Sequence, residues 1–258
     1  MSRVICICNQ KGGVGKTTTA VNVSTCLAMS KKRTLLIDID PQANASTGFG
    51  VRLSRDEPSI YEALIGQVEP SSIVRDVEIE GLFLLPSSQN LIGAEVELVG
   101  LENRETFLLR LIETIGYNFD YILIDCPPSL GFLTLNALVA AQSVIIPIQC
   151  EYYALEGVSA LLNTIQKVSE IFNENLFIQG FVLTMFDSRN NICHQVVSNV
   201  KQNLVDQVFK TIIPRNVRLS EAPSFGKPVM IYDPQSTGAM SYLALTMEIL
   251  DAENKRSN

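Results

Sequence analysis

The stretch NQKGGVGKTTTAVN, residues 9–22, decides the fold, because it lies between an apolar run of strand length and a segment of helical period. Glycines at such a junction let backbone N–H groups point toward an anion, and the N-terminus of the following helix adds partial positive charge. The pattern therefore predicts a phosphate-binding loop, in which Lys16 reaches the terminal phosphates of a nucleotide and the Thr17 hydroxyl ligates Mg²⁺. The strict pattern GxxxxGK[ST] fails at one position, where Gln10 replaces glycine, and Lys11 adds a lysine at the front of the loop.

Outward from this loop, short apolar runs alternate with longer segments of helical period, which is typical of a parallel sheet covered by helices on both faces. A chain of 258 residues is long enough to bury one full core. We therefore expect an α/β fold, with a single domain over residues 1–250 built on a doubly wound, mostly parallel sheet flanked by helices, and a polar tail at residues 251–258. The expected strands are Val4–Asn9, Thr34–Asp38, Leu82–Pro86, Tyr121–Asp125, Ser143–Ile148, Ile178–Thr184 and Thr211–Pro214. The expected helices are Lys16–Ser30, Arg104–Ile115, Leu130–Ala141, Gly157–Phe172, Ile192–Val208 and Gly238–Ala252.

Two further segments place carboxylates at the ends of buried strands. The segment LLIDIDPQAN, residues 35–44, carries Asp38 and Asp40, whose side chains share one face because an extended chain alternates with period two. The segment YILIDCPPS, residues 121–129, ends in the same way with Asp125, which fits a Walker B carboxylate that holds Mg²⁺ through water. Each aspartate alone could simply cap a strand end. Three such motifs at the carboxyl ends of parallel strands favour one shared site.

The formal net charge of −7 argues against a chain covered in cations for binding nucleic acid or anionic lipid. The charge is unevenly distributed, however. Residues 56–105 carry eleven acidic side chains against two basic ones, whereas residues 189–228 carry six basic side chains against Asp206 and Glu221. We therefore expect a polarised molecule, with an acidic region and a basic region.

The six cysteines include no C-x-x-C pair, so reduced thiols are expected rather than a disulfide framework or a zinc site. No apolar run approaches the roughly 18 residues of a membrane span, and we expect no leader segment before the first strand. A reducing cytoplasm is the expected compartment. His194, the one histidine, is expected on a helix surface with no nucleophile to activate.

The motif KGGxGK[ST] resembles the deviant Walker A motif of the ParA, MinD and Soj ATPases. With DIDPQAN, LIDCPPSLG, LTMFDSR and IPRNVRLSEAPSFGKPV, the resemblance to the Soj/ParA partition ATPases extends from about Val4 to Leu250. It implies a P-loop NTPase of the SIMIBI type that uses ATP and Mg²⁺ and forms an ATP-sandwich homodimer. It also implies slow ATP hydrolysis stimulated by a ParB/Spo0J-like protein, in chromosome or plasmid partitioning, with a cytoplasmic and nucleoid-associated location.

The resemblance implies roles for individual residues. Lys11 is expected to reach the partner subunit's nucleotide, Lys16 to contact the phosphates of its own subunit, and Asp40 to position the attacking water. Thr17, Asp38 and Asp125 are expected to form the magnesium shell. The remaining expected nucleotide contacts are Gly12, Gly13, Val14, Gly15 and Thr18 in the loop, and Met185, Phe186, Pro214, Arg215 and Asn216 around the adenine.

In the resembling family, basic residues of the C-terminal part bind DNA without sequence preference when two subunits pair. Arg189 and Arg218 stand at matching positions, and Lys201 and Arg215 are weaker candidates. The alternative is that these are solvated surface charges. Non-specific binding is mostly phosphate neutralisation with counterion release, so a dimer that pairs two basic regions could bind DNA despite its net charge. The sequence shows no helix-turn-helix or zinc finger for reading bases.

Other functions of related ATPases fit less well. Membrane binding of the MinD type needs an amphipathic C-terminal helix, whereas GAMSYLALTMEILDAE has the pattern of a core helix and DAENKRSN has no bulky apolar residue. An iron–sulfur relative would need bridging cysteines, and Cys126 and Cys150 are better explained as buried thiols. A scaffold or regulator that positions a protein complex rather than DNA stays open, because the acidic region could recruit a basic partner. The cargo, whether chromosome, plasmid or protein cluster, also stays open.

Overall fold

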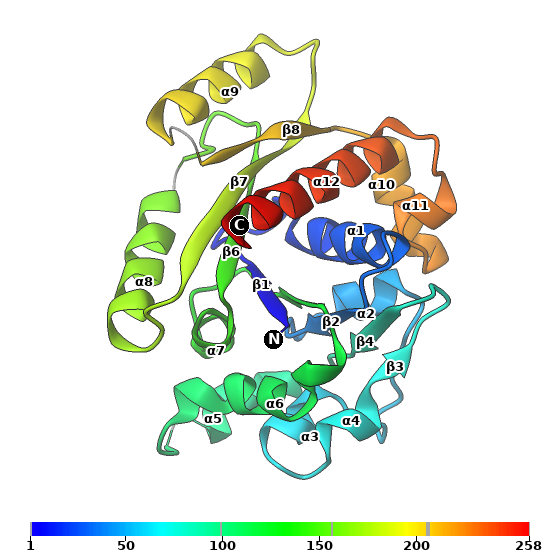
Figure 1. The fold of residues 1–258 in the computed structure, drawn as a ribbon, viewed down its shortest axis with the longest axis vertical. Helices are drawn as coiled ribbons and strands as arrows, with labels where there is room; N and C mark the ends of the chain where they lie inside the picture. Colours follow the sequence, from blue (N-terminus) through cyan, green and yellow to red (C-terminus); the bar gives the residue numbers. More distant parts are fainter. Residues whose placement is uncertain (1, 99, 156, 205–206, 258) are drawn as a thin grey trace.

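A central parallel sheet organises the molecule (Figure 1). The computed structural model describes residues 2–98, 100–155, 157–204 and 207–257. Within these ranges eight strands form one sheet in the order β3-β4-β2-β5-β1-β6-β7-β8. Neighbouring strands are parallel except for the edge pair β3 and β4, so the expected doubly wound, mostly parallel sheet is confirmed. The strands are β1 (Arg3–Ile7), β2 (Thr34–Asp38), β3 (Arg75–Asp76), β4 (Leu82–Leu85), β5 (Tyr121–Asp125), β6 (Ser143–Gln149), β7 (Phe177–Phe186) and β8 (Val208–Pro214).

Helices cover both faces of this sheet. On one face α1 and α12 lie side by side, with α2 and α11 beside them, and the other face is covered by α3 to α9 (Figure 1). The first group comprises α1 (Lys16–Met29), α2 (Asn44–Gly48), α11 (Val229–Tyr232) and α12 (Thr237–Ser257). The second comprises α3 (Ile60–Leu64), α4 (Pro70–Ile73), α5 (Leu91–Glu97), α6 (Phe107–Ile115), α7 (Phe132–Ala140), α8 (Val158–Ile171) and α9 (Asn191–Asn203). The short helix α10 (Val217–Glu221) follows β8, and single 3₁₀ turns lie at Arg104–Thr106, Gly116–Asn118 and Ala222–Phe225.

Both faces of the sheet are covered by helices, and successive side chains of each strand point to opposite faces, so both faces are apolar. In β1, Val4 and Cys6 pack in the cluster beneath α6 and α7, whereas Ile5 and Ile7 pack in the cluster beneath α1 and α12. A strand of this kind has to be apolar at every position, which explains the continuous Val, Ile and Leu runs in the sequence. No helix in the described ranges is both long and apolar enough to cross a membrane.

The last helix differs from its expected limits. Residues 251–257, which we expected as a polar tail, continue α12. Their composition is compatible with a helix, and Glu253 fastens it to the sheet by accepting hydrogen bonds from the Tyr121 hydroxyl (2.5 Å) and the Gln179 amide (3.4 Å). The helix expected at Ile192–Val208 ends earlier, at Asn203, and β8 begins at Val208. Residues 205–206 of that expectation, including Asp206, lie outside the described residues.

Candidate active site

Glycine residues and the hydrogen bonds of two side chains, Asn9 and Thr184, determine the shape of the loop between β1 and α1. Gly13 and Gly15 have φ of 74° and 90°, a conformation that L side chains rarely adopt. Asn9 fastens the front of the loop, since its amide donates to the Pro147 carbonyl (2.7 Å) and its side-chain oxygen accepts from the Lys11 N–H (3.0 Å). At the back, the Thr184 hydroxyl donates to the Val14 carbonyl (2.9 Å). Val14 therefore contributes to loop shape through its backbone.

Lys16, the first residue of α1, is buried below this loop. Its ammonium group donates to the Lys11 carbonyl (3.1 Å), and only 6% of the residue is exposed. Burial lowers the pKa of Lys16, and the negative charge of Asp125 is the largest opposing influence, followed among the carboxylates by Asp40. A cation fixed between a glycine loop and two carboxylates can contact an anionic group that enters the loop.

Asp38 and Asp125 end neighbouring strands at the same level. They are register partners in β2 and β5, and Asp125 is also the partner of Ile7, the last residue of β1. The Asp38 carboxylate accepts hydrogen bonds from the N–H and hydroxyl of Ser46, both at 2.8 Å, and from the Asp40 N–H at 3.1 Å. Burial raises the pKa of Asp38 to about 6 although these hydrogen bonds oppose the shift.

Asp125 is fully buried and both of its carboxylate oxygens lack a hydrogen-bond partner within the described part of the chain. Burial first, and then the charge of Asp38, raise the pKa of Asp125 well above its usual range, while Thr17 and Lys16 act in the opposite direction. Buried oxygens without donors are rare and mark a place for a missing ligand. A hard divalent cation such as Mg²⁺ fits them, since it binds through one or two carboxylates together with water and phosphate oxygens.

Asp40 lies in a tight turn just beyond β2. Its Oδ1 accepts from the Gln42 N–H (2.9 Å), and its carbonyl accepts from the Ala43 N–H (2.8 Å) and the Ser87 hydroxyl (2.7 Å). The Ser87 N–H in turn donates to the Ser46 hydroxyl (3.1 Å). Sequence reasoning missed both serines. Ser87 could have been found from its place just after β4, because the carboxyl ends of all these parallel strands meet at one edge.

Two cavities lie along this edge. One of about 420 Å³ is lined by Gly12, Gly13, Gly15, Lys16, Thr17, Thr18 and Asp40, together with residues of α2, Pro128 and Met185. A second, of about 280 Å³, is lined by Met185, Pro214, Arg215 and Asn216 and also by Thr184, Leu219, Ser220 and Tyr242. The two share Gly15, Thr18, Met185 and Pro223, so they adjoin. The structure thus brings together the residues expected at the phosphates and most of those expected at the adenine.

Phe186 is the exception among the expected adenine contacts. It lines neither cavity, and its ring packs edge-on against His194 with 5.1 Å between ring centroids. The cause is the backbone at Met185, whose φ of 53° is unusual for a bulky residue and breaks the regular alternation at the end of β7. Phe186 contributes through its carbonyl, which accepts from the Arg215 N–H at 2.9 Å. His194 is exposed on α9, as predicted.

Lys11 does not line the cavity of its own loop. Its ammonium group lies 3.9 Å from Glu151 Oε2, and the guanidinium of Arg215 lies 4.0 Å from Glu151 Oε1. The Lys11 side chain is 39% exposed. The two lysines of the loop therefore occupy different environments: Lys16 is buried and donates to the Lys11 carbonyl, whereas Lys11 lies at the surface beside Glu151.

Three of the candidate DNA-binding residues, Arg189, Lys201 and Arg218, lie on the β7–α9 loop, on α9 and on α10. Arg189 donates two hydrogen bonds to Asp187, at 2.9 and 2.7 Å, and its side chain is 86% exposed. Lys201 is exposed in the last turn of α9. Arg218 is paired with two carboxylates, Glu221 on α10 and Asp233 just after α11. Sequence reasoning did not predict that both arginines have carboxylate partners.

The six cysteines are free and buried, as expected. Cys6 and Cys126 lie 3.4 Å apart at their sulfur atoms, in the core below the site, and burial raises the pKa of both thiols. Thiols in such surroundings are unreactive. They offer nothing that would support the iron–sulfur alternative.

The site defines a P-loop NTPase. A glycine loop joins β1 to α1, a buried lysine begins the helix, and two aspartates end adjacent parallel strands.

Comparison with known proteins identifies the family within this class. A family model described as an AAA domain matches residues 2–178. The sporulation initiation inhibitor protein Soj of Bacillus subtilis is 53% identical over 96% of this chain and 98% of that protein.

Two further proteins are similar to this chain over most of its length. The chromosome partitioning protein ParA of Myxococcus xanthus is 52% identical over all of this chain and 91% of that protein. The crystal structure of cobyrinic acid a,c-diamide synthase from Mycobacterium smegmatis with bound ADP and magnesium has a TM-score of 0.87 and 36% identity, and covers 98% of this chain and 96% of that one. The chain belongs to the Soj/ParA family of chromosome-partitioning ATPases.

Proposed function

We propose that this protein is an ATP-dependent switch in chromosome or plasmid partitioning. In this proposal it binds ATP and Mg²⁺, forms a homodimer that sandwiches two ATP molecules, and binds DNA non-specifically as the dimer. Hydrolysis stimulated by a ParB-like protein resets it, in the cytoplasm and at the nucleoid. The observation that carries the proposal is the separation of the two loop lysines, with Lys16 inside the phosphate cavity and Lys11 outside it.

The magnesium ion would be held by Thr17 and Asp125, with Asp38 beside them. When bound, it would neutralise charge on the phosphate oxygens. The unpartnered oxygens of Asp125 support this assignment, as does the bound ADP and magnesium in the similar structure from Mycobacterium smegmatis. The hydrogen bonds from Ser46 keep Asp38 pointing toward the same edge.

Phosphoryl transfer asks the protein for positioning and charge neutralisation rather than for covalent chemistry. Lys16 and the loop N–H groups would hold the terminal phosphates, and the Asp40 carboxylate, at the rim of the same cavity, would accept a hydrogen bond from the attacking water. Lys11 would supply its positive charge to the partner subunit's nucleotide. Hydrolysis would then be slow in the monomer because one cation is missing from each site.

A second function is favoured by one observation. Because Arg189 and Arg218 are both paired with carboxylates, the basic region is less positive than its lysine and arginine content indicates. The same switch could therefore act as a scaffold or regulator that positions a protein complex instead of binding DNA.

The two steps of the proposal can be tested on one set of proteins. With ATP and Mg²⁺, Asp40→Ala should accumulate as a dimer in light scattering after gel filtration, whereas Lys11→Ala should stay monomeric. A gel shift with duplex DNA of arbitrary sequence at low salt should show binding only with ATP. A dimer that forms without any DNA binding would favour the scaffold function, and an Asp40→Ala variant that fails to bind ATP would overturn the role of Asp40.

A further inference from the structure

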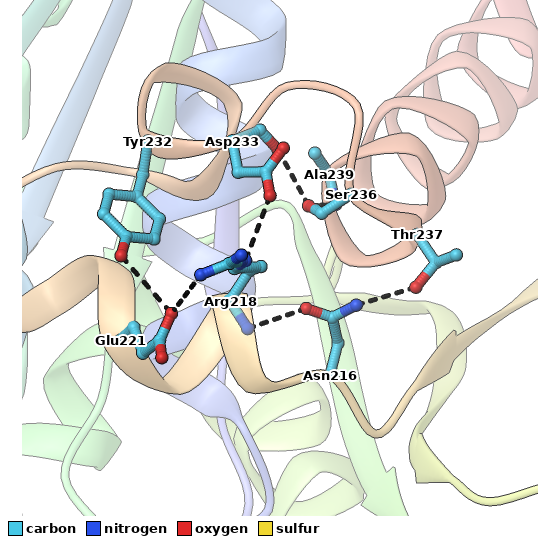
Figure 2. Close-up of polar contacts among 8 residues, drawn as sticks. All are labelled: Asn216, Arg218, Glu221, Tyr232, Asp233, Ser236, Thr237 and Ala239. Carbon is cyan, nitrogen blue, oxygen red and sulfur yellow. Dashed lines mark hydrogen bonds and ion pairs between the residues drawn. The ribbon is translucent and has the colours of Figure 1, made fainter.

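Arg218 lies between two carboxylates, one on its own helix and one beyond it (Figure 2). Its Nη1 donates to Glu221 Oε2 at 2.8 Å, and its Nε lies 3.1 Å from Asp233 Oδ2. Glu221 also accepts from the Tyr232 hydroxyl at 3.3 Å. This group of one cation and two anions has an excess negative charge, although Arg218 and Glu221 lie in the segment, residues 189–228, that is basic by composition.

The same short helix forms a wall of the smaller cavity. Asn216 caps α10 by accepting from the Arg218 N–H at 2.9 Å, and its amide donates to the Thr237 hydroxyl at 2.7 Å at the start of α12 (Figure 2). Asn216 and Leu219 line the cavity expected to hold the adenine. Asp233 is fixed at the other end of the cluster, since its carbonyl accepts from the Ser236 hydroxyl at 2.8 Å. The Glu221 carboxylate thus has a second partner in the Tyr232 hydroxyl, whereas Asp233 is fixed through its backbone carbonyl.

These ion pairs can be exchanged. The side chains of Arg218, Glu221 and Asp233 are 50%, 39% and 33% exposed, and ion pairs in contact with water stabilise a protein only weakly. A DNA phosphate offers the guanidinium the same kind of charge-assisted hydrogen bond as a carboxylate does. The phosphate must, however, approach Arg218 against the negative charges of Glu221 and Asp233.

We propose that Glu221 and Asp233 are built-in competitors of DNA phosphate at Arg218, so that the two carboxylates set how strongly the ATP-bound protein holds DNA. This inference rests on the proposed DNA-binding function. In this inference, the two acidic residues weaken the DNA binding that Arg218 provides. DNA is then released readily once dimerisation no longer doubles the number of contacts.

The test uses isosteric variants that remove charge and keep shape. In the full-length protein with ATP and Mg²⁺, Glu221→Gln and Asp233→Asn should each tighten binding of a non-specific duplex about two- to fivefold at low salt. The matched control is Glu174→Gln, which removes one exposed negative charge in the turn between α8 and β7 and should have a smaller effect. Unchanged affinity of the variants for a fluorescent ATP analogue checks that α10 still forms the cavity wall.

A second comparison shows whether the effect passes through Arg218. In an Arg218→Ala background, Glu221→Gln should tighten DNA binding no more than Glu174→Gln does. If the wild-type protein binds DNA but the two isosteric variants match the control, or if their effect persists without Arg218, the inference is overturned and the DNA-binding function stands. If only the variants bind DNA, the competition is supported and the DNA-binding function of the wild type is overturned. If none of them binds DNA, both fail.

Discussion

Asp38 and Asp125 are register partners at the ends of β2 and β5, yet Asp38 accepts three hydrogen bonds while both Asp125 oxygens have no donor among the described residues. Two carboxylates at one level of the sheet thus have different tasks. Asp38 is oriented by the protein, whereas Asp125 is the carboxylate that we propose for a ligand. Burying the Asp125 carboxyl without hydrogen-bond partners destabilises the folded state.

The first prediction concerns this destabilisation. At neutral pH, Asp125→Asn should raise the free energy of unfolding of the nucleotide-free protein by about 1–3 kcal/mol, because burial raises the pKa of Asp125 and an amide does not carry that cost of ionisation or proton uptake. The same variant should lose the stabilisation that ATP and Mg²⁺ give to the wild type. Urea unfolding with and without the ligands measures both effects. A nucleotide-free Asp125→Asn variant that is less stable than the wild type would contradict the interpretation of Asp125 as a buried carboxyl without partners.

The second prediction concerns pH. The pKa of Asp38 is raised to about 6 in the folded protein, so the folded state binds more protons than the unfolded state between about pH 4 and pH 6. The Asp38 contribution therefore lowers stability as pH rises through this window, by about 3 kcal/mol in all. The measurement is the difference in unfolding free energy between the wild type and Asp38→Asn at several pH values, without nucleotide. A difference that stays constant from pH 4 to pH 7 would exclude the raised pKa.

The third prediction separates the two lysines. Lys16→Ala should weaken ATP binding at least about thirtyfold, because it removes the buried cation that we propose for the phosphates. Lys11→Ala should leave ATP binding by the monomer within about threefold, since Lys11 is exposed and lies outside the cavity. Titration of a fluorescent ATP analogue at low protein concentration provides the affinities. Equal losses in the two variants would show that Lys11 acts within its own subunit.

The fourth prediction concerns a contact between two backbone segments. A Cβ atom at Gly226 would lie 2.7 Å from the Gly50 Cα and 3.0 Å from its nitrogen, and Gly226 has a φ of 62°. Gly226→Ala should therefore destabilise the protein by about 2–4 kcal/mol, combining backbone strain with a clash between the loop after α2 and the loop before α11.

Gly66→Ala is the matched control, because Gly66 has a φ of 74° and no atom within 4 Å of its would-be Cβ. It should show the backbone strain alone, about 1 kcal/mol. Urea unfolding of the two variants gives the comparison. If both lose the same stability, the contact between Gly50 and Gly226 does not contribute.

The sequence was enough to predict the parallel sheet, its main helices and the meeting of the glycine loop with the strand-end aspartates at one edge. This works because a glycine loop and strand-end aspartates are local features, and the parallel arrangement brings them together whatever the loops do. Phe186 could not be placed in this way. Its direction depends on the positive φ of Met185, a conformation that no turn residue announces in the sequence.

Contacts between distant residues were also beyond sequence reasoning. Glu151 meets Lys11 across 140 positions, and Asp233 meets Arg218 only because the chain turns back between α10 and α12. A count of charges along the chain records Arg218 as a free cation. The fold decides how much of that charge a ligand can use.

The fastening of α12 by Glu253 has a practical consequence for studying the protein. Glu253 contacts Tyr121 and Gln179, which lie near the starts of β5 and β7, whereas the P-loop, Asp38 and Asp125 lie where the strands end. A fluorophore attached near the end of α12 would sit at the opposite rim of the sheet from bound nucleotide. Imaging labels are best placed there, and trimming the chain before residue 253 would loosen the rim that carries them.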